Sequence, residues 1–110
     1  GCIFVVMDDL IGAANIDAKH SNEDQIAPFS VWVDRYGDKI GNFGGIDTDV
    51  LCRYDAAYIR SYILDCLEKV KGHGGIAFSS GNSIPDYVPT EGYLAMVETV
   101  REWRGDKAAF

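Results

Sequence analysis

The chain has 110 residues, of which 47% are hydrophobic, and this composition suits one globular domain with its own core. Its 17 acidic and 10 basic residues give a formal net charge of -7. That balance argues against nucleic acid or an anionic membrane as a partner, because both require clustered Lys and Arg. No apolar run approaches the roughly 20 residues that span a bilayer, and no basic secretory signal opens the chain, so we expect a cytoplasmic protein.

The first predicted element is a helix. Apolar residues recur at helical spacing over positions 3–11, and small or polar residues follow over positions 12–15. A short strand is then predicted to begin near Ile16.

The next predicted helix follows a polar loop and carries Ile26, Phe29 and Val33 on one face. Pro28 suits its first turn, where the missing N–H group has no partner to lose. Gly37 is predicted to end this helix in a left-handed conformation.

The order of strand, loop and helix then recurs twice. A second strand is predicted near Lys39, a loop over positions 46–53, and Asp55 as the N-cap of an amphipathic helix. A third strand begins near Ile76, and Pro89 opens its helix. The predicted apolar sides consist of Ile59, Ile63, Cys66, Leu67 and Val70 in the earlier helix and of Tyr93, Val97, Val100 and Trp103 in the later one.

Strands that alternate with amphipathic helices predict an α/β fold with a parallel sheet, because parallel neighbours need a helical crossover. A (β/α)8 barrel uses about 31 residues per unit, so the chain equals about three and a half units. This length is too short to close a barrel, so we expect positions 1–105 to form three βα units, preceded by one helix, as a fragment of a larger fold. Positions 106–110 are expected to form a frayed C-terminal tail.

Three stretches resemble the uroporphyrinogen decarboxylase superfamily: GNFGGID at positions 41–47, FSSGNSIP at 78–85 and PTEGYLAMVETVRE at 89–102. The resemblance covers nearly the whole chain. The stretch NEDQIAPF at positions 22–29 favours the branch of cobamide-dependent methyltransferases. The resemblance implies the last three strands of a (β/α)8 TIM barrel and their helices.

In such a barrel the site lies at the carboxyl ends of the strands, so the polar residues after each strand would share one rim. The first cluster of such residues runs from Lys19 to Asp24. The substrate-binding candidates are Glu23, Gly44, Gly45, Ser79, Ser80 and Gly81, and the catalytic candidates are His20, Asp47 and Asn82.

Each catalytic candidate has a structural alternative. Asp47 follows two glycines that let a ligand approach the backbone, but its carboxylate equally suits an Asx-turn. His20 can act as a base or as a ligand, or can be a loop imidazole bonded to the backbone or to Glu23. Asn82 can close a turn. For Asp24, which follows Glu23 directly, the expected role is to stabilise the dipole at the start of a helix.

For the zinc-dependent members, the resemblance implies a His-x-Cys pair before position 1 and another Cys at the position of Asn82. Asparagine is a poor zinc ligand beside a thiolate, and the decarboxylases typically have His there. Cys2, Cys52 and Cys66 are widely spaced and predict no metal site in this chain. Zinc and a corrinoid methyl donor are therefore expected only in the intact parent protein.

These features together predict the C-terminal part of a corrinoid-dependent methyltransferase-type enzyme. The alternatives are a uroporphyrinogen decarboxylase proper and a non-catalytic module for interaction or ligand binding. The isolated chain is expected to be inactive. Open strand edges and an apolar sheet face predict self-association or pairing with the missing N-terminal part of the barrel. In the parent, the expected partners are a small-molecule substrate and a corrinoid protein.

Overall fold

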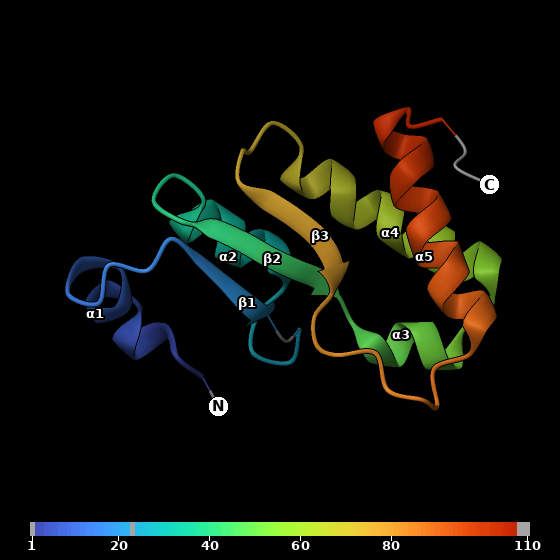
Figure 1. The fold of residues 1–110 in the computed structure, drawn as a ribbon, viewed down its shortest axis with the longest axis horizontal. Helices are drawn as coiled ribbons and strands as arrows, with labels where there is room; N and C mark the ends of the chain where they lie inside the picture. Colours follow the sequence, from blue (N-terminus) through green and yellow to red (C-terminus); the bar gives the residue numbers. More distant parts are fainter. Residues whose placement is uncertain (1, 23, 108–110) are drawn as a thin grey trace.

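The computed structural model describes residues 2–22 and 24–107 (Figure 1). Within these residues the elements are, in chain order, the 3-10 helix η1 (Phe4–Val6), α1 (Met7–Gly12), β1 (Ala18–Asn22), α2 (Phe29–Tyr36), β2 (Gly41–Ile46), α3 (Thr48–Arg53), α4 (Ala56–Val70), β3 (Ile76–Ser80) and α5 (Thr90–Arg104). Among them, no helix is both long enough and apolar enough to cross a membrane.

The three strands form one sheet in the order β1-β2-β3, and both neighbouring pairs run parallel. The prediction of an α/β fold with a parallel sheet is therefore confirmed. The register between β2 and β3 continues without a shift from the pair of Asn42 and Ile76 onward. The register between β1 and β2 shifts between Lys19 and Asn22, so β1 is irregular at its carboxyl end.

Helices α2 and α4 lie against one face of the sheet (Figure 1). Phe43 and Ala77, which are register partners in β2 and β3, are both exposed. Phe78, the neighbour of Ala77 in β3, packs against Phe29 of α2. Successive residues of a strand point to opposite faces, so Ala77 and its partner Phe43 lie on the face opposite to α2. No helix of the described residues covers this second face (Figure 1). The sheet is therefore packed on one side only.

The core divides into clusters between the sheet and the helices. In one cluster, Phe4 stacks on Trp32 of α2 with ring centroids 4.1 Å apart, and Met7 of α1 is completely buried. This cluster holds the N-terminal helices against α2. Another cluster joins β2, α3, α4 and α5 and consists of Ile46, Leu51, Ile59, Ile63, Leu67, Ala95 and Met96.

The predicted start of α4 is confirmed. Asp55 is the N-cap residue, and its side chain accepts a hydrogen bond of 2.8 Å from the backbone N–H of Tyr58. The predicted apolar side is buried at Ile59, Ile63, Leu67 and Val70, while Cys66 lies half-buried beside it.

Two strands begin later than predicted. Ile16 is held outside the sheet because its N–H donates to the carbonyl of Leu10 at the end of α1. Lys39 donates its N–H to the carbonyl of Tyr36, so this residue still belongs to the turn that follows α2. The sheet therefore starts at Ala18 and Gly41.

The predicted loop over positions 46–53 is wrong, because most of it forms α3 after Asp47 supplies an N-cap. The predicted left-handed stop at Gly37 is also wrong. Gly37 has a φ of -65°, and its N–H donates to the carbonyl of Val33, so it continues the right-handed turn.

The buried side of α5 differs from the predicted one. Tyr93 and Trp103 are exposed, and Val97 and Val100 lie at the margin of the core. The buried residues are instead Gly92, Ala95, Met96 and Thr99. A Cβ at Gly92 would lie 2.3 Å from the carbonyl oxygen of Leu51, so α5 contacts α3 through its smallest residue.

The chain leaves α5 through Gly105, whose φ of 74° places it in the left-handed region. Part of the predicted frayed tail is bonded to the helix, because the Asp106 N–H donates to the carbonyl of Arg101 over 2.9 Å. Positions 108–110 of the predicted tail lie outside the described residues.

Candidate functional site

A pocket of about 220 Å³ lies at the edge of the sheet where the carboxyl ends of the three strands meet. The polar residues that follow the strands therefore share one rim, as expected for parallel strands. The pocket is lined by Asn22, Asp24, Gln25, Ile46, Asp47, Thr48, Gly81 and Asn82.

Two glycines lie near the carboxyl end of β2, beside this rim. Gly44 and Gly45 have φ values of 117° and 107°, a region that side chains disfavour. A Cβ at Gly45 would lie 2.6 Å from the ring of Phe29 and 2.8 Å from that of Phe78. These glycines do not line the pocket, so they support the site through backbone shape and packing.

Asn22 ends β1 and is buried, with 3% of its surface exposed. Its Oδ1 accepts a hydrogen bond of 2.7 Å from Lys19 Nζ, and its Nδ2 donates one of 2.8 Å to the carbonyl of Phe43. These bonds satisfy the amide and join β1 to β2 at the point where the register shifts. The sequence offered a signal for this role, since Asn22 is a polar residue at a strand end.

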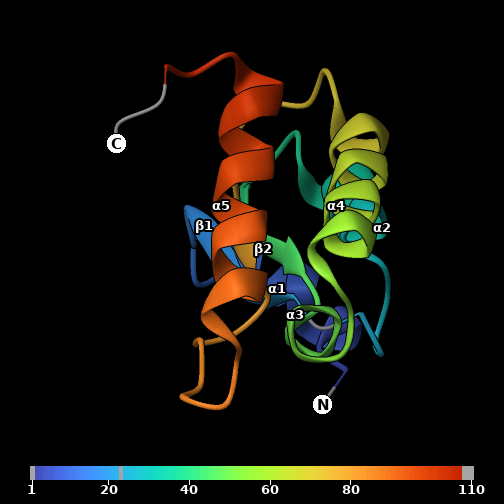
Figure 2. The same ribbon diagram turned by 90° about the vertical axis from the view of Figure 1, so that its right-hand side faces the viewer.

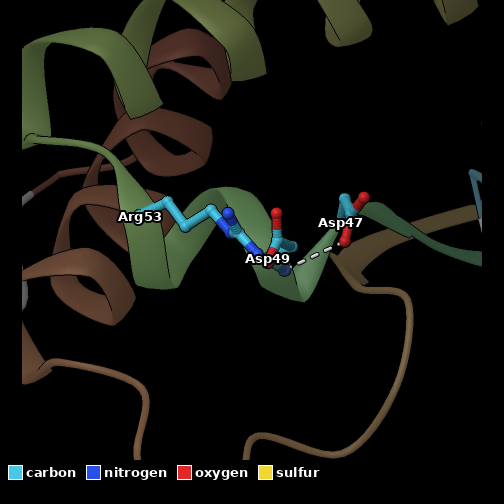
Figure 3. A network of polar contacts seen from close by, with 3 residues as sticks. All are labelled: Asp47, Asp49 and Arg53. Carbon is cyan, nitrogen blue, oxygen red and sulfur yellow. Dashed lines mark hydrogen bonds and ion pairs between the residues drawn. The ribbon is translucent and has the colours of Figure 1, made fainter.

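Asp47 follows β2 directly and caps α3. Its Oδ1 accepts a hydrogen bond of 2.9 Å from the backbone N–H of Asp49, as Figure 3 shows. The carboxylate of Asp49 in turn pairs with Arg53 Nε at 2.6 Å on the exposed surface. The Asx-turn alternative for Asp47 therefore describes its geometry, while the residue also lines the pocket.

Asp24 lies in the pocket and contacts α4. The hydroxyl of Tyr62 donates a hydrogen bond of 2.7 Å to Asp24 Oδ2. The predicted role at a helix dipole is wrong, because α2 begins at Phe29 and no acidic residue occupies its first turn. Burial raises the pKa of Asp24, and the nearby charge of Asp47 adds to this effect, although the bond from Tyr62 opposes it.

A second cavity of about 210 Å³ lies on the other side of Asp24. Its lining includes Tyr62 and Cys66 of α4 together with Gly45 of β2. Burial raises the pKa of Cys66 and that of Tyr62, so both groups favour their neutral forms. Asp24 is therefore the ionisable residue that belongs to both cavities.

The loop after β3 forms the third side of the rim. Ser80 Oγ donates a hydrogen bond of 2.7 Å to the carbonyl of Asn82, and Asn82 Oδ1 accepts one of 2.8 Å from the Ser83 N–H. Ser79 Oγ donates to the carbonyl of Ser80. Gly81 is buried, and it packs so closely on β1 that a Cβ there would lie 2.7 Å from the carbonyl oxygen of Asn22.

The predicted site residues thus fall into separate groups. Asp47, Gly81 and Asn82 line the pocket, and Ser80 positions the loop. His20 is exposed in β1 and does not line the pocket, and neither does Ser79. Glu23, the remaining candidate, lies outside the described residues.

The pocket offers two carboxylates and three side-chain amides, which suit a polar small molecule with hydrogen-bond donors. Within residues 2–22 and 24–107, no three His, Cys, Asp or Glu side chains gather as a metal-binding group. The residues of the rim, two carboxylates and amides without Cys or His, do not fit zinc by themselves.

Comparisons with known proteins add no assignment to this geometry. No family model matches the chain, and no curated protein or solved structure shows a significant match to it.

Proposed function

We propose that the chain forms part of the small-molecule site of a uroporphyrinogen decarboxylase-like enzyme, of the corrinoid-dependent methyltransferase type. The observation that carries the proposal is the polar pocket at the carboxyl ends of parallel strands, lined by Asp24, Asp47 and Asn82. Functional groups of α/β barrels gather at that end of the strands. The motifs GNFGGID and FSSGNSIP, which carry the resemblance, supply Asp47, Gly81 and Asn82 to this pocket.

In methyl transfer to a thiol, the bond between the methyl carbon and the corrinoid donor breaks with its electron pair left on the donor, the new bond joins the methyl carbon to sulfur, and the thiol gives up its proton. Asp24 is suited to receive that proton, because burial makes its carboxyl a stronger base than an exposed one. Asp47 and Asn82 are assigned the binding of the polar part of the acceptor. The corrinoid methyl donor is a substrate of the reaction and belongs to a partner protein. No step is assigned to zinc.

A carboxy-lyase is the second candidate, and the Asp24 carboxyl specifically favours it. When a carboxylate leaves as carbon dioxide, a proton must replace it on the substrate carbon. A carboxyl with a raised pKa, bonded to the Tyr62 hydroxyl and lining a pocket, is suited to donate that proton.

The test uses the full-length protein in which this chain occurs. Asp24→Asn is expected to lower kcat by about 100-fold, since general acid–base groups contribute on that order. Asn82→Ala is expected to raise KM. Asp49→Asn is the matched control, because Asp49 is an exposed carboxylate two residues from Asp47 that does not line the pocket.

Two assays separate the candidate reactions. Methylation of a thiol supports the first, and release of carbon dioxide from a porphyrinogen supports the second. If Ser80→Ala and Asn82→Ala leave both substrate affinity and turnover unchanged, the loop after β3 is only a turn. If ligand binds without turnover in either assay, the chain belongs to a non-catalytic binding module.

A further inference from the structure

The outer edge of β3 differs from the outer edge of β1. β1 contains a register shift, Ser21 has a positive φ of 64°, and Lys19 lies within the strand. Bulges and lysines are features that prevent an edge strand from pairing with another chain. β3 has the sequence IAFSS, with a regular register and no charge or proline. The β3 edge is therefore the one suited to accept a further strand.

The hydrogen bonds to β2 show which backbone groups of β3 face outward. Asn42 donates its N–H to the carbonyl of Gly75, and Gly81 donates its N–H to the carbonyl of Ile46. In a parallel ladder, alternate residues of a strand bond to the same neighbour. Ala77 and Ser79 therefore bond to β2, whereas the N–H and C=O groups of Ile76 and Phe78 point away from it.

A groove of about 590 Å³ runs beside the amino-terminal half of this edge. Leu67 and Val70 of α4, Ile76 and Phe78 of β3, and Val100 of α5 form its apolar part. Lys71 and Arg104 lie at its end, and no acidic side chain is among the described residues that line it. Both cations have acidic partners outside the lining, since Lys71 pairs with Glu68 at 3.4 Å and Arg104 with Asp106 at 3.5 Å on the exposed surface, so an acidic residue of a bound strand would compete with these pairs. The groove therefore combines an apolar wall, free strand hydrogen-bonding groups and a basic end.

The position of α5 limits which kind of partner can bind at the β3 edge. In Figures 1 and 2, α5 stands beyond β3 on the side opposite to β2. A second copy that continued the sheet through its own β3 would bring further strands and helices toward α5. A single added strand needs only about 4.8 Å from β3.

We propose that the β3 edge and this groove bind one extended peptide strand from a partner polypeptide. The strand has apolar side chains at alternate positions, which face the groove, and an acidic residue at the end near Lys71 and Arg104. Main-chain hydrogen bonds to Ile76 and Phe78 provide affinity, and the groove and its basic end provide specificity. This surface is separate from the polar pocket, so its test does not depend on the reaction assigned to that pocket.

The test uses the isolated chain and a synthetic peptide, acetyl-Glu-Val-Thr-Val-Thr-Val-amide, with amide hydrogen exchange measured by NMR. The peptide is expected to slow exchange of the Ile76 and Phe78 amides by about tenfold. The Ala77 and Ser79 amides are internal controls, because β2 already protects them. Unchanged exchange at Ile76 and Phe78 with about 1 mM peptide overturns the proposal.

Charge reversal tests the basic end. Lys71→Glu is expected to weaken binding of this peptide by about threefold, and a peptide with Lys in place of Glu is expected to restore it. Lys69→Glu is the matched control, because Lys69 is an exposed lysine of α4 that does not line the groove. Equal effects of the two variants contradict the assignment of the acidic residue.

Sedimentation equilibrium tests whether a second copy of the chain, and not a peptide strand, occupies the β3 edge. If the Ile76 and Phe78 amides become protected without peptide as the chain concentration rises, and a dimer forms in parallel, a second copy occupies the edge. That outcome overturns the single-strand proposal.

Discussion

The hydroxyl of Tyr62 on α4 donates a hydrogen bond of 2.7 Å to Asp24 Oδ2, in the segment between β1 and α2. The bond joins the rim of the pocket to the helix layer across 38 positions of sequence. It also holds an acidic group in a half-buried place, where its ionisation is opposed by burial and by the charge of Asp47.

The stability of the chain should therefore depend on pH through Asp24. Its pKa is raised in the folded state, so its contribution to stability is full below the unfolded pKa of about 3.9 and is lost as pH rises through the folded pKa. The Asp24→Asn variant has no carboxyl to ionise at this position, so it does not lose stability in this way as the pH rises. The free energy of unfolding of the variant, relative to the natural chain, should increase from about pH 4 toward neutral pH, as measured by urea denaturation.

The control for this prediction is Asp49→Asn, whose relative stability should not follow the same pH course, because Asp49 is exposed. Tyr62→Phe should raise the pKa of Asp24 further, since the hydroxyl stabilises the ionised carboxylate. NMR titration of the Asp24 carboxyl carbon measures both effects. An Asp24 pKa at or below the ordinary value would contradict the burial of this group.

Replacing Asn22 should test the bond between β1 and β2. Asn22→Ala leaves the carbonyl of Phe43 and the ammonium of Lys19 without the contacts that the amide makes. The expected loss of unfolding free energy is about 1–3 kcal/mol. His20→Ala is the control and should have little effect, because His20 is exposed in the same strand. A similar loss for both variants would mean that the hydrogen bonds of the Asn22 amide make no particular contribution to the free energy of unfolding.

Adding a methyl group to Gly45 should destabilise the fold. The new Cβ would lie within 3 Å of the rings of Phe29 and Phe78, and its φ of 107° is unfavourable for alanine. We expect Gly45→Ala to lower the free energy of unfolding by roughly 1–3 kcal/mol. Gly12→Ala, where nothing lies within 4 Å, should be neutral or slightly stabilising. Thermal denaturation of the two variants measures this contrast.

The N-cap of α4 offers a local test of helix stability. Asp55→Ala removes the acceptor for the Tyr58 N–H and should cost about 1 kcal/mol of unfolding free energy. Asp55→Asn keeps an acceptor oxygen and should retain most of the stability. If both variants lose the same amount, the charge at the helix start matters more than the hydrogen bond.

The order of the elements could be predicted from the sequence because it depends on local signals. The cap at Asp55 and the apolar side of α4 are confirmed. The short helix α3 was missed because its N-cap, Asp47, also has the sequence context of a loop after two glycines. The buried side of α5 was misassigned because Gly92 and Thr99 are buried although they have little or no apolar side chain, whereas Tyr93 and Trp103 are exposed.

Part of the candidate site could also be predicted from the sequence. Residues directly after parallel strands meet at one edge, and this rule brought Asp47, Gly81 and Asn82 together. The importance of Asp24 was not predictable, because it depends on Tyr62, whose position is set by tertiary packing. The bonds of Asn22 depend in the same way on the register shift in β1.

The contact between Gly92 and Leu51 fixes more than the packing of two helices. Gly92 lies in the first turn of α5, whereas the apolar groove beside β3 lies at the opposite end of this helix. A side chain at Gly92 would push the first turn away from α3 and so change the direction of the helix axis, which also positions Val100 and Arg104 at the groove. The close approach of one glycine to α3 is therefore coupled, through the length of the helix, to the position of the groove-lining residues at its other end.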